Sequence, residues 1–180
     1  MEKAAELRDS VGLVNLGNSY YKGECGYRQD YKKALECYNK AAAEKPPLPR
    51  AFTCIATLHA AGHTRADGRP DYKAAFKNAE VAAKLGCVMG NAVVAEYYKR
   101  GREVPRDLKK ARGYWQRAAI QGHPESMFEL GKLYEFGTGV KRDRQQAYKY
   151  VAMAAMQGFE RAIGTMASGL PATELIPLRG

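Results

Sequence analysis

The sequence lacks any long apolar run. No stretch of about 18 consecutive apolar residues occurs along its 180 residues, so no membrane-spanning helix is predicted. The opening segment, Met1 to Ser10, has no apolar core and carries acidic residues, so neither a signal peptide nor a transit peptide is predicted. From these absences we expect an intracellular protein, in the cytoplasm rather than in an organelle, with the organelle as the alternative.

Residues that commonly catalyse reactions or hold metals are few and scattered. Of the three histidines, His59 and His63 are four residues apart and His123 lies far from both, and the four cysteines form no C-x-x-C pair. We expect these cysteines to be small buried residues in a reducing cell, with disulfides in an oxidising compartment as the alternative. Ser19 and Lys22 have the Ser-x-x-Lys spacing of penicillin-recognising enzymes, but the companion Ser-Asp-Asn and Lys-Thr-Gly motifs are missing. We therefore predict no enzyme activity, no cofactor and no metal.

The sequence contains an internal repeat. The segment Tyr114–Gly122 includes a double alanine and ends in Gln-Gly, and the same pattern returns as Tyr150–Gly158. The spacing between these segments also separates Asp107 from Asp143. Periods of roughly 20 to 50 residues are typical of stacked units rather than of a closed globule.

Each repeat is predicted to form a helix, a turn and a second helix. A glycine can end the first helix because it tolerates positive φ, and an aspartate can cap the N-terminus of the second. Small residues in the first helix, such as Gly17 and Gly131, would allow close packing. The predicted turn glycines are Gly23, Gly62, Gly101 and Gly137, and the predicted N-caps are Asp30, Asp71, Asp107 and Asp143.

The repeat predicts one elongated all-α domain that spans residues 1–180. Partial helices at both ends would cap the stack, as repeat proteins require, or the sequence is a piece of a longer array. The predicted repeats cover residues 13–45, 50–86, 91–122 and 126–158, with partial repeats at 1–12 and 159–170 and an irregular tail at 171–180.

These patterns resemble the Sel1-like repeat family. The resemblance extends over roughly residues 3 to 168 and is most complete in the fourth repeat. It implies an α/α solenoid of helix-turn-helix repeats, akin to tetratricopeptide arrays, whose members mostly act as adaptors and scaffolds. The family pattern is carried in the fourth repeat by Leu130-Gly131, Tyr134, Gly137, Gly139-Val140, Asp143, Ala147, Tyr150, Ala154-Ala155 and Gly158.

The repeat also predicts a right-handed superhelix with the first helices on its concave side. Side chains there that the core does not use would form a groove, and such a groove can hold a peptide or protein segment. Our first hypothesis is therefore a non-catalytic protein-interaction module. The predicted groove residues are Asn15, Asn18, Lys22, Thr57, Glu96, Arg100, Lys132 and Phe136.

Positive charge is in excess and gathers beside the turns. The net charge is +10, from 29 lysines and arginines against 19 acidic residues. Stacked repeats would align part of this charge into a basic edge, which could dock an acidic segment of another protein. The alternatives are an RNA- or ribonucleoprotein-associated subunit that binds phosphates, or a merely solvated face. The predicted basic edge consists of Arg102, Arg106, Lys109, Lys110, Lys141, Arg142 and Arg144.

Overall fold

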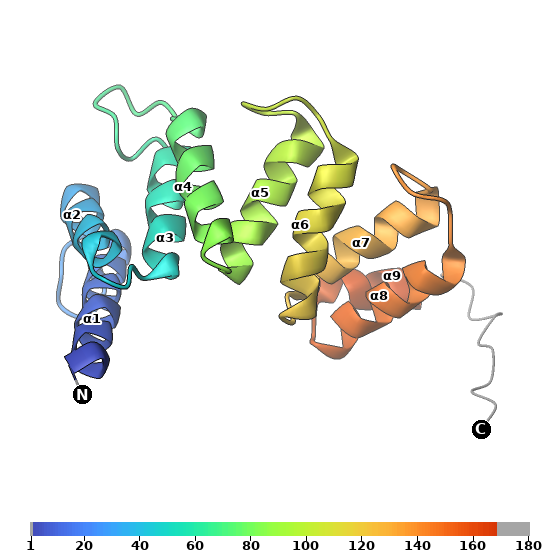
Figure 1. The fold of residues 1–180 in the computed structure, drawn as a ribbon, viewed down its shortest axis with the longest axis horizontal. Coiled ribbons are helices and arrows are strands. Elements are labelled where there is room, and N and C mark those ends of the chain that lie inside the picture. The colour runs from blue at the N-terminus through green and yellow to red at the C-terminus, as the bar shows by residue number, and fades with distance from the viewer. Residues whose placement is uncertain (1, 169–180) are drawn as a thin grey trace. The chain divides into compact units, whose positions relative to one another are not determined.

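The fold is known from a computed structural model that describes residues 2–168, with side chains from residue 9 onward. All regular structure in this range is helical (Figure 1). The first helices of the successive repeats are α1, α3, α5 and α7, and the second helices are α2, α4, α6 and α8. The helix bounds are α1 (Glu2–Lys22), α2 (Tyr31–Ala43), α3 (Pro49–Ala60), α4 (Tyr72–Lys84), α5 (Val88–Arg100), α6 (Leu108–Ile120), α7 (Pro124–Phe136), α8 (Arg144–Met156) and α9 (Glu160–Ala167).

The chain forms two compact bodies, Met1–Arg106 and Asp107–Gly180, which we call the N-terminal body and the C-terminal body. In the N-terminal body α1 packs on α2 and α3 packs on α4, while α2 meets α3 and α4 meets α5 (Figure 1). In the C-terminal body α7 packs on α8, α6 meets α7, and α8 meets α9. Contacts are therefore made mainly between sequence neighbours, as in repeat proteins.

The ends of the helices follow the predicted signals. All four predicted aspartate N-caps are confirmed, because each carboxylate accepts the main-chain N–H three residues further on. Each such cap contributes about 0.5–2 kcal/mol of stability. Helices α5 and α7 end at Gly101 and Gly137, both with a φ of 66°, a left-handed conformation that glycine adopts without a steric penalty. The carboxylate-to-nitrogen distances are 3.0, 2.9, 2.9 and 3.0 Å for Asp30, Asp71, Asp107 and Asp143.

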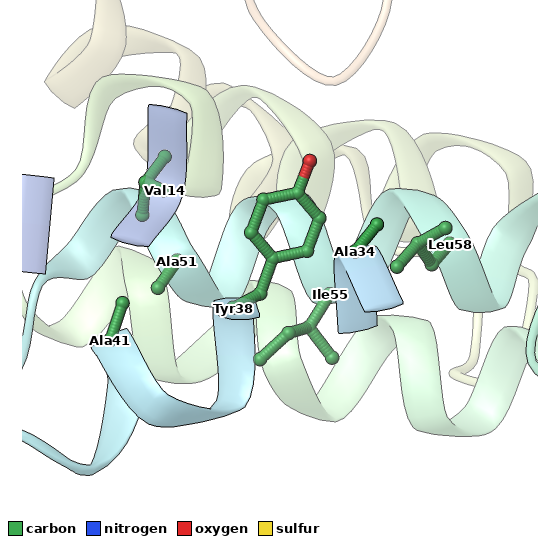
Figure 2. Packing of buried hydrophobic residues seen from close by; sticks show 7 residues of the cluster. All are labelled: Val14, Ala34, Tyr38, Ala41, Ala51, Ile55 and Leu58. Atoms are coloured by element: carbon green, nitrogen blue, oxygen red, sulfur yellow. The ribbon is translucent and has the colours of Figure 1, made fainter. Parts of the chain in front are cut away.

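The core of the N-terminal body gathers around Tyr38 (Figure 2). This residue is only 2% exposed, and burial raises the pKa of its phenol. The protonated hydroxyl reaches out of the apolar cluster and donates a hydrogen bond of 2.8 Å to Asn18 Oδ1. The apolar residues around the ring come from α1, α2 and α3 and are Val14, Ala34, Ala41, Ala51, Ile55 and Leu58.

In the C-terminal body the two helices of the fourth repeat approach each other at Gly131. A Cβ atom placed on Gly131 would lie 2.6 Å from Val151 Cγ2 and 3.1 Å from the Ala147 carbonyl oxygen of α8. Beside this contact, the rings of Tyr134 and Tyr150 stack with centroids 5.8 Å apart. The predicted close approach at Gly131 is confirmed, since a side chain there would have to push α8 away.

The N-terminal end differs from the prediction. We expected a partial helix over residues 1–12 and a new helix from residue 13, but α1 runs through this point without a break. Gly12 lies at the predicted break but does not adopt the positive φ of the turn glycines, so it is part of α1.

The C-terminal end carries the additional first helix that the sequence predicts. Helix α9 is short and buries Ala162 against the fourth repeat. The predicted irregular tail, residues 171–180, lies outside the described residues.

Gly131→Ala should lower the free energy of unfolding by roughly 1–3 kcal/mol, because the added methyl group overlaps Val151. Gly113→Ala on α6 is the matched control, since nothing lies within 4 Å of the position of its added Cβ. That substitution should stabilise the protein by about 0.5–1 kcal/mol through helix propensity. Urea unfolding of the three proteins measures both changes. Equal effects of the two substitutions would contradict the close approach.

Candidate partner-binding surface

The predicted groove residues lie on first helices of both bodies. In the N-terminal body they are on α1, α3 and α5, and in the C-terminal body they are on α7. We describe the two sets separately and call their exposed side chains the first-helix face. The N-terminal set is Asn15, Asn18, Lys22, Thr57, Glu96 and Arg100, and the C-terminal set is Lys132 and Phe136.

Several predicted groove residues in the N-terminal body already have partners within the chain. Asn18 accepts the hydrogen bond from Tyr38, which holds its side chain against the core. Glu96 forms ion pairs with Lys99 at 3.4 Å and with Arg100 at 2.5 Å on the same helix. Glu96 and Arg100 therefore neutralise each other in the absence of a ligand.

The Ser-x-x-Lys spacing is not assembled into a reactive pair. Ser19 Oγ donates to the Asn15 carbonyl oxygen at 3.2 Å, and Lys22 Nζ lies 3.5 Å from a Glu24 carboxylate oxygen. A Ser–Lys nucleophile needs the lysine to take the serine proton. Ser19 and Lys22 instead interact with Asn15 and Glu24, and no hydrogen bond joins these two described side chains.

Sequence reasoning missed exposed apolar residues that share a side of a first helix with predicted groove residues, such as Val11 on α1 and Met89 on α5. Met89 on α5 is 51% exposed. It precedes Glu96 by about two helical turns and Arg100 by about three, so the three residues share one side of the helix. The spacing of 7 and 11 residues from Met89 to Glu96 and Arg100, which is close to whole helical turns, could have identified Met89 from the sequence.

On α7 the exposed aromatic ring and the cation have different roles. Phe136, the last residue of the helix, is 73% exposed. Lys132 Nζ lies 3.0 Å from Glu129, a residue that is only 7% exposed, and 5.7 Å from the centroid of the buried Phe128 ring. Arg161 of α9 lies over the same ring at 5.1 Å. Lys132 thus helps to satisfy a buried carboxylate, while Phe136 is left for solvent or a partner.

A histidine begins α7. His123 is the N-cap, and its Nδ1 accepts the Ser126 main-chain N–H at 3.2 Å and lies 2.9 Å from Ser126 Oγ. Burial lowers the pKa of His123, while the Glu125 carboxylate acts in the opposite direction. The neutral imidazole can accept at Nδ1, whereas the protonated ring has no lone pair for the helix. Sequence reasoning gave His123 no role.

The predicted basic edge is divided between the two bodies. Arg102 and Arg106 belong to the N-terminal body, where the Arg102 guanidinium lies over the Tyr72 ring, 4.0 Å from its centroid. The other members belong to the C-terminal body, on α6, on the α7–α8 loop and at the start of α8. These members are Lys109, Lys110, Lys141, Arg142 and Arg144.

Within the C-terminal body the basic edge is only partly neutralised. Lys110 lies 3.9 Å from Asp107, and Arg142 and Arg144 lie 3.2 and 4.0 Å from Glu135. These exposed pairs are weak, worth about 0–1 kcal/mol each. Among the described side chains, those of Lys109 and Lys141 are exposed and have no ion-pair partner.

The described part of the chain contains no metal-binding cluster, and three of its four thiols are buried or half-buried. No group of three His, Cys, Asp or Glu side chains could hold a metal among residues 9–168. The four cysteines are free, and burial raises the pKa of the Cys37 and Cys54 thiols, which keeps them protonated and poorly nucleophilic. No helix of the described residues has the length and apolar content needed to cross a bilayer.

The helix pairs, caps and close-approach glycines recur with the spacing of a known repeat. The pattern of the Sel1 repeat matches residues 10–45, 57–87, 89–123 and 124–159. The chain belongs to the Sel1 repeat family. This membership and the helical fold confirm the predicted α/α solenoid class. Sel1 repeats are in general protein-interaction modules, which agrees with the coarse functional hypothesis.

Solved structures of Sel1 repeat proteins share the fold. A Sel1 repeat protein from Oxalobacter formigenes is 28% identical, with a TM-score of 0.78 over 93% of this chain and 66% of its own. The protective antigen c5321 from uropathogenic Escherichia coli is 30% identical, with a TM-score of 0.76 over 93% of this chain and 34% of its own. The present chain thus spans less than two thirds of either relative. No match was found among curated protein sequences.

Lys132→Glu should destabilise the Sel1 repeat fold, because it places a second negative charge beside the buried Glu129. We expect a loss on the order of 1–2 kcal/mol, reduced from the cost at a fully buried pair because Lys132 is partly exposed. Lys149→Glu on α8, an exposed lysine, is the control and should change stability by less than about 0.5 kcal/mol. Thermal unfolding compares the two variants, and equal melting temperatures would contradict a structural role for Lys132.

His123→Asn should flatten part of the pH dependence of stability. Folding lowers the pKa of His123, so its contribution is complete above the unfolded value of about 6.5 and is lost as pH falls through the lower folded pKa. Asparagine caps a helix at any pH in this range. The melting temperature of the wild type should therefore fall relative to the variant between about pH 8 and pH 5. A difference that stays constant with pH would contradict the capping role.

Proposed function

We propose that this Sel1 repeat chain is a non-catalytic adaptor that holds a segment of another protein on its first-helix face. The observation that carries the proposal is the exposure of Phe136. Large aromatic side chains are common anchors of protein interfaces, and this ring is 73% exposed at the end of an otherwise well-packed helix. Other large apolar residues of α7 are buried, namely Met127, Phe128, Leu130 and Leu133.

The polar surroundings of the first-helix face support this assignment. Lys132 and Arg100 form ion pairs on their own helices, so their side chains are already ordered before a partner arrives. A preformed surface loses less conformational entropy on binding than a disordered one. In the C-terminal body, Phe136 lies one helical turn beyond Lys132, so an apolar anchor and a paired polar group are neighbours, as in the apolar centre and polar rim that protein interfaces use.

Phe136→Asp should abolish capture of the native partner while leaving the fold intact. Partner recovery from the native cell after cross-linking should fall at least about tenfold, which corresponds to roughly 1.4 kcal/mol of binding free energy. Met156→Asp is a matched control, since Met156 is 87% exposed and is likewise the last residue of its helix, but lies on the second helix α8.

Quantitative mass spectrometry of the captured proteins measures the difference. Circular dichroism melts of both variants verify that neither substitution unfolds the chain. A partner retained equally by the wild type and by Phe136→Asp would overturn the proposed face, and so would a partner lost with Met156→Asp alone.

A further inference from the structure

The α7–α8 loop folds back onto the end of α7, beside Phe136. The Asp143 main-chain N–H donates to the Tyr134 carbonyl oxygen at 3.0 Å. Arg142 Nε donates to the Glu135 carbonyl oxygen at 2.8 Å, and its guanidinium also pairs with the Glu135 carboxylate. The cationic loop is therefore fixed next to the residue that precedes the exposed ring.

The same loop also meets the first turn of α6. A Cβ atom placed on Gly139 would lie 3.0 Å from Leu108 Cβ. Lys109 follows Leu108 directly, and Lys141 lies two residues beyond Gly139. The contact therefore brings both exposed lysines to the part of the C-terminal body that carries Phe136, and we call Lys109, Lys141 and Phe136 the docking corner.

The two lysines of this corner make no ion pair within the described part of the chain. Lys109 lies in the first turn of α6, where the Asp107 cap carboxylate is 3.9 Å from Lys110 Nζ. Lys141 lies in the α7–α8 loop, where the Glu135 carboxylate pairs with Arg142. Lys109 and Lys141 are exposed and have no ion-pair partner among the described side chains, so their charges are available to a partner.

The mixture of charges at the corner favours a protein partner over a nucleic acid. The carboxylates of Asp107, Glu135 and Asp143 lie among the cations. The evenly spaced phosphates of a nucleic acid would be repelled by these carboxylates. A peptide can place its acidic side chains opposite the lysines alone.

We infer that the docking corner binds an acidic–apolar segment of a partner protein. An aliphatic or aromatic side chain of the segment packs on Phe136, and neighbouring Asp or Glu side chains pair with Lys109 and Lys141. The inference rests on the proposed function, because it names the chemistry of the segment that the first-helix face holds at its C-terminal body.

The test is a selection from a random peptide display library on the full chain. The wild type should enrich peptides that carry Asp or Glu beside an aromatic or aliphatic residue. Lys109→Glu/Lys141→Glu should lose the acidic preference, and Lys149→Glu, the exposed control lysine on α8, should keep it. Fluorescence anisotropy of the most enriched peptide should then show roughly tenfold weaker binding to the double variant, and weaker binding to the wild type at higher salt.

Three outcomes would overturn the inference: no enrichment, enrichment without acidic residues, or an acidic preference that the double variant retains. Binding of a labelled oligouridine that the double variant loses would also overturn it, by assigning the corner to nucleic acid. Loss of the enriched peptide with Phe136→Asp but not with the double variant sinks this inference and leaves the proposed function standing. Full binding to Phe136→Asp contradicts the proposed function, and this inference with it.

Discussion

The two bodies depend on the close approach of two helices within a repeat, α1 on α2 in the N-terminal body and α7 on α8 in the C-terminal body. Gly17 lies against the Tyr38 ring, and Gly131 lies against Val151, with no room for a side chain at either glycine. Because the packing uses small residues on one side of these first helices, exposed residues on the other side, such as Phe136, are not needed for that contact. This division of one helix into a packing side and an open side is what allows a repeat protein to vary its surface without losing its fold.

Several charged side chains of the first-helix face form ion pairs within their own helices. Lys132 and Arg100 form ion pairs with carboxylates one helical turn away, and Phe136 lies one turn beyond Lys132. Lys109 at the start of α6 and Lys141 in the α7–α8 loop, by contrast, have no ion-pair partner among the described side chains. The apolar anchor Phe136 therefore ends α7, while the lysines lie on α6 and on the α7–α8 loop. The contact between Gly139 of this loop and Leu108 of α6 brings the two elements together.

Features set by local chemistry could be predicted from the sequence. The aspartate caps and the turn glycines depend on residues within one turn, so the repeat pattern was enough to identify them. The state of the candidate site depends on contacts between side chains. Neither the bond from Tyr38 to Asn18 nor the pairing of Lys132 with the buried Glu129 has a sequence signature. The unbroken α1 could not be predicted in this way, because Gly12 at the predicted break is compatible both with a turn and with a continuous helix.

The most direct measurement of where a partner lies is zero-length carbodiimide cross-linking of the captured complex, read by peptide mass spectrometry. This chemistry joins a lysine only to a carboxylate that it contacts. The account predicts links from Lys109 or Lys141 to acidic residues of the partner. Links confined to other exposed lysines, such as Lys77, Lys84 and Lys149, would contradict it.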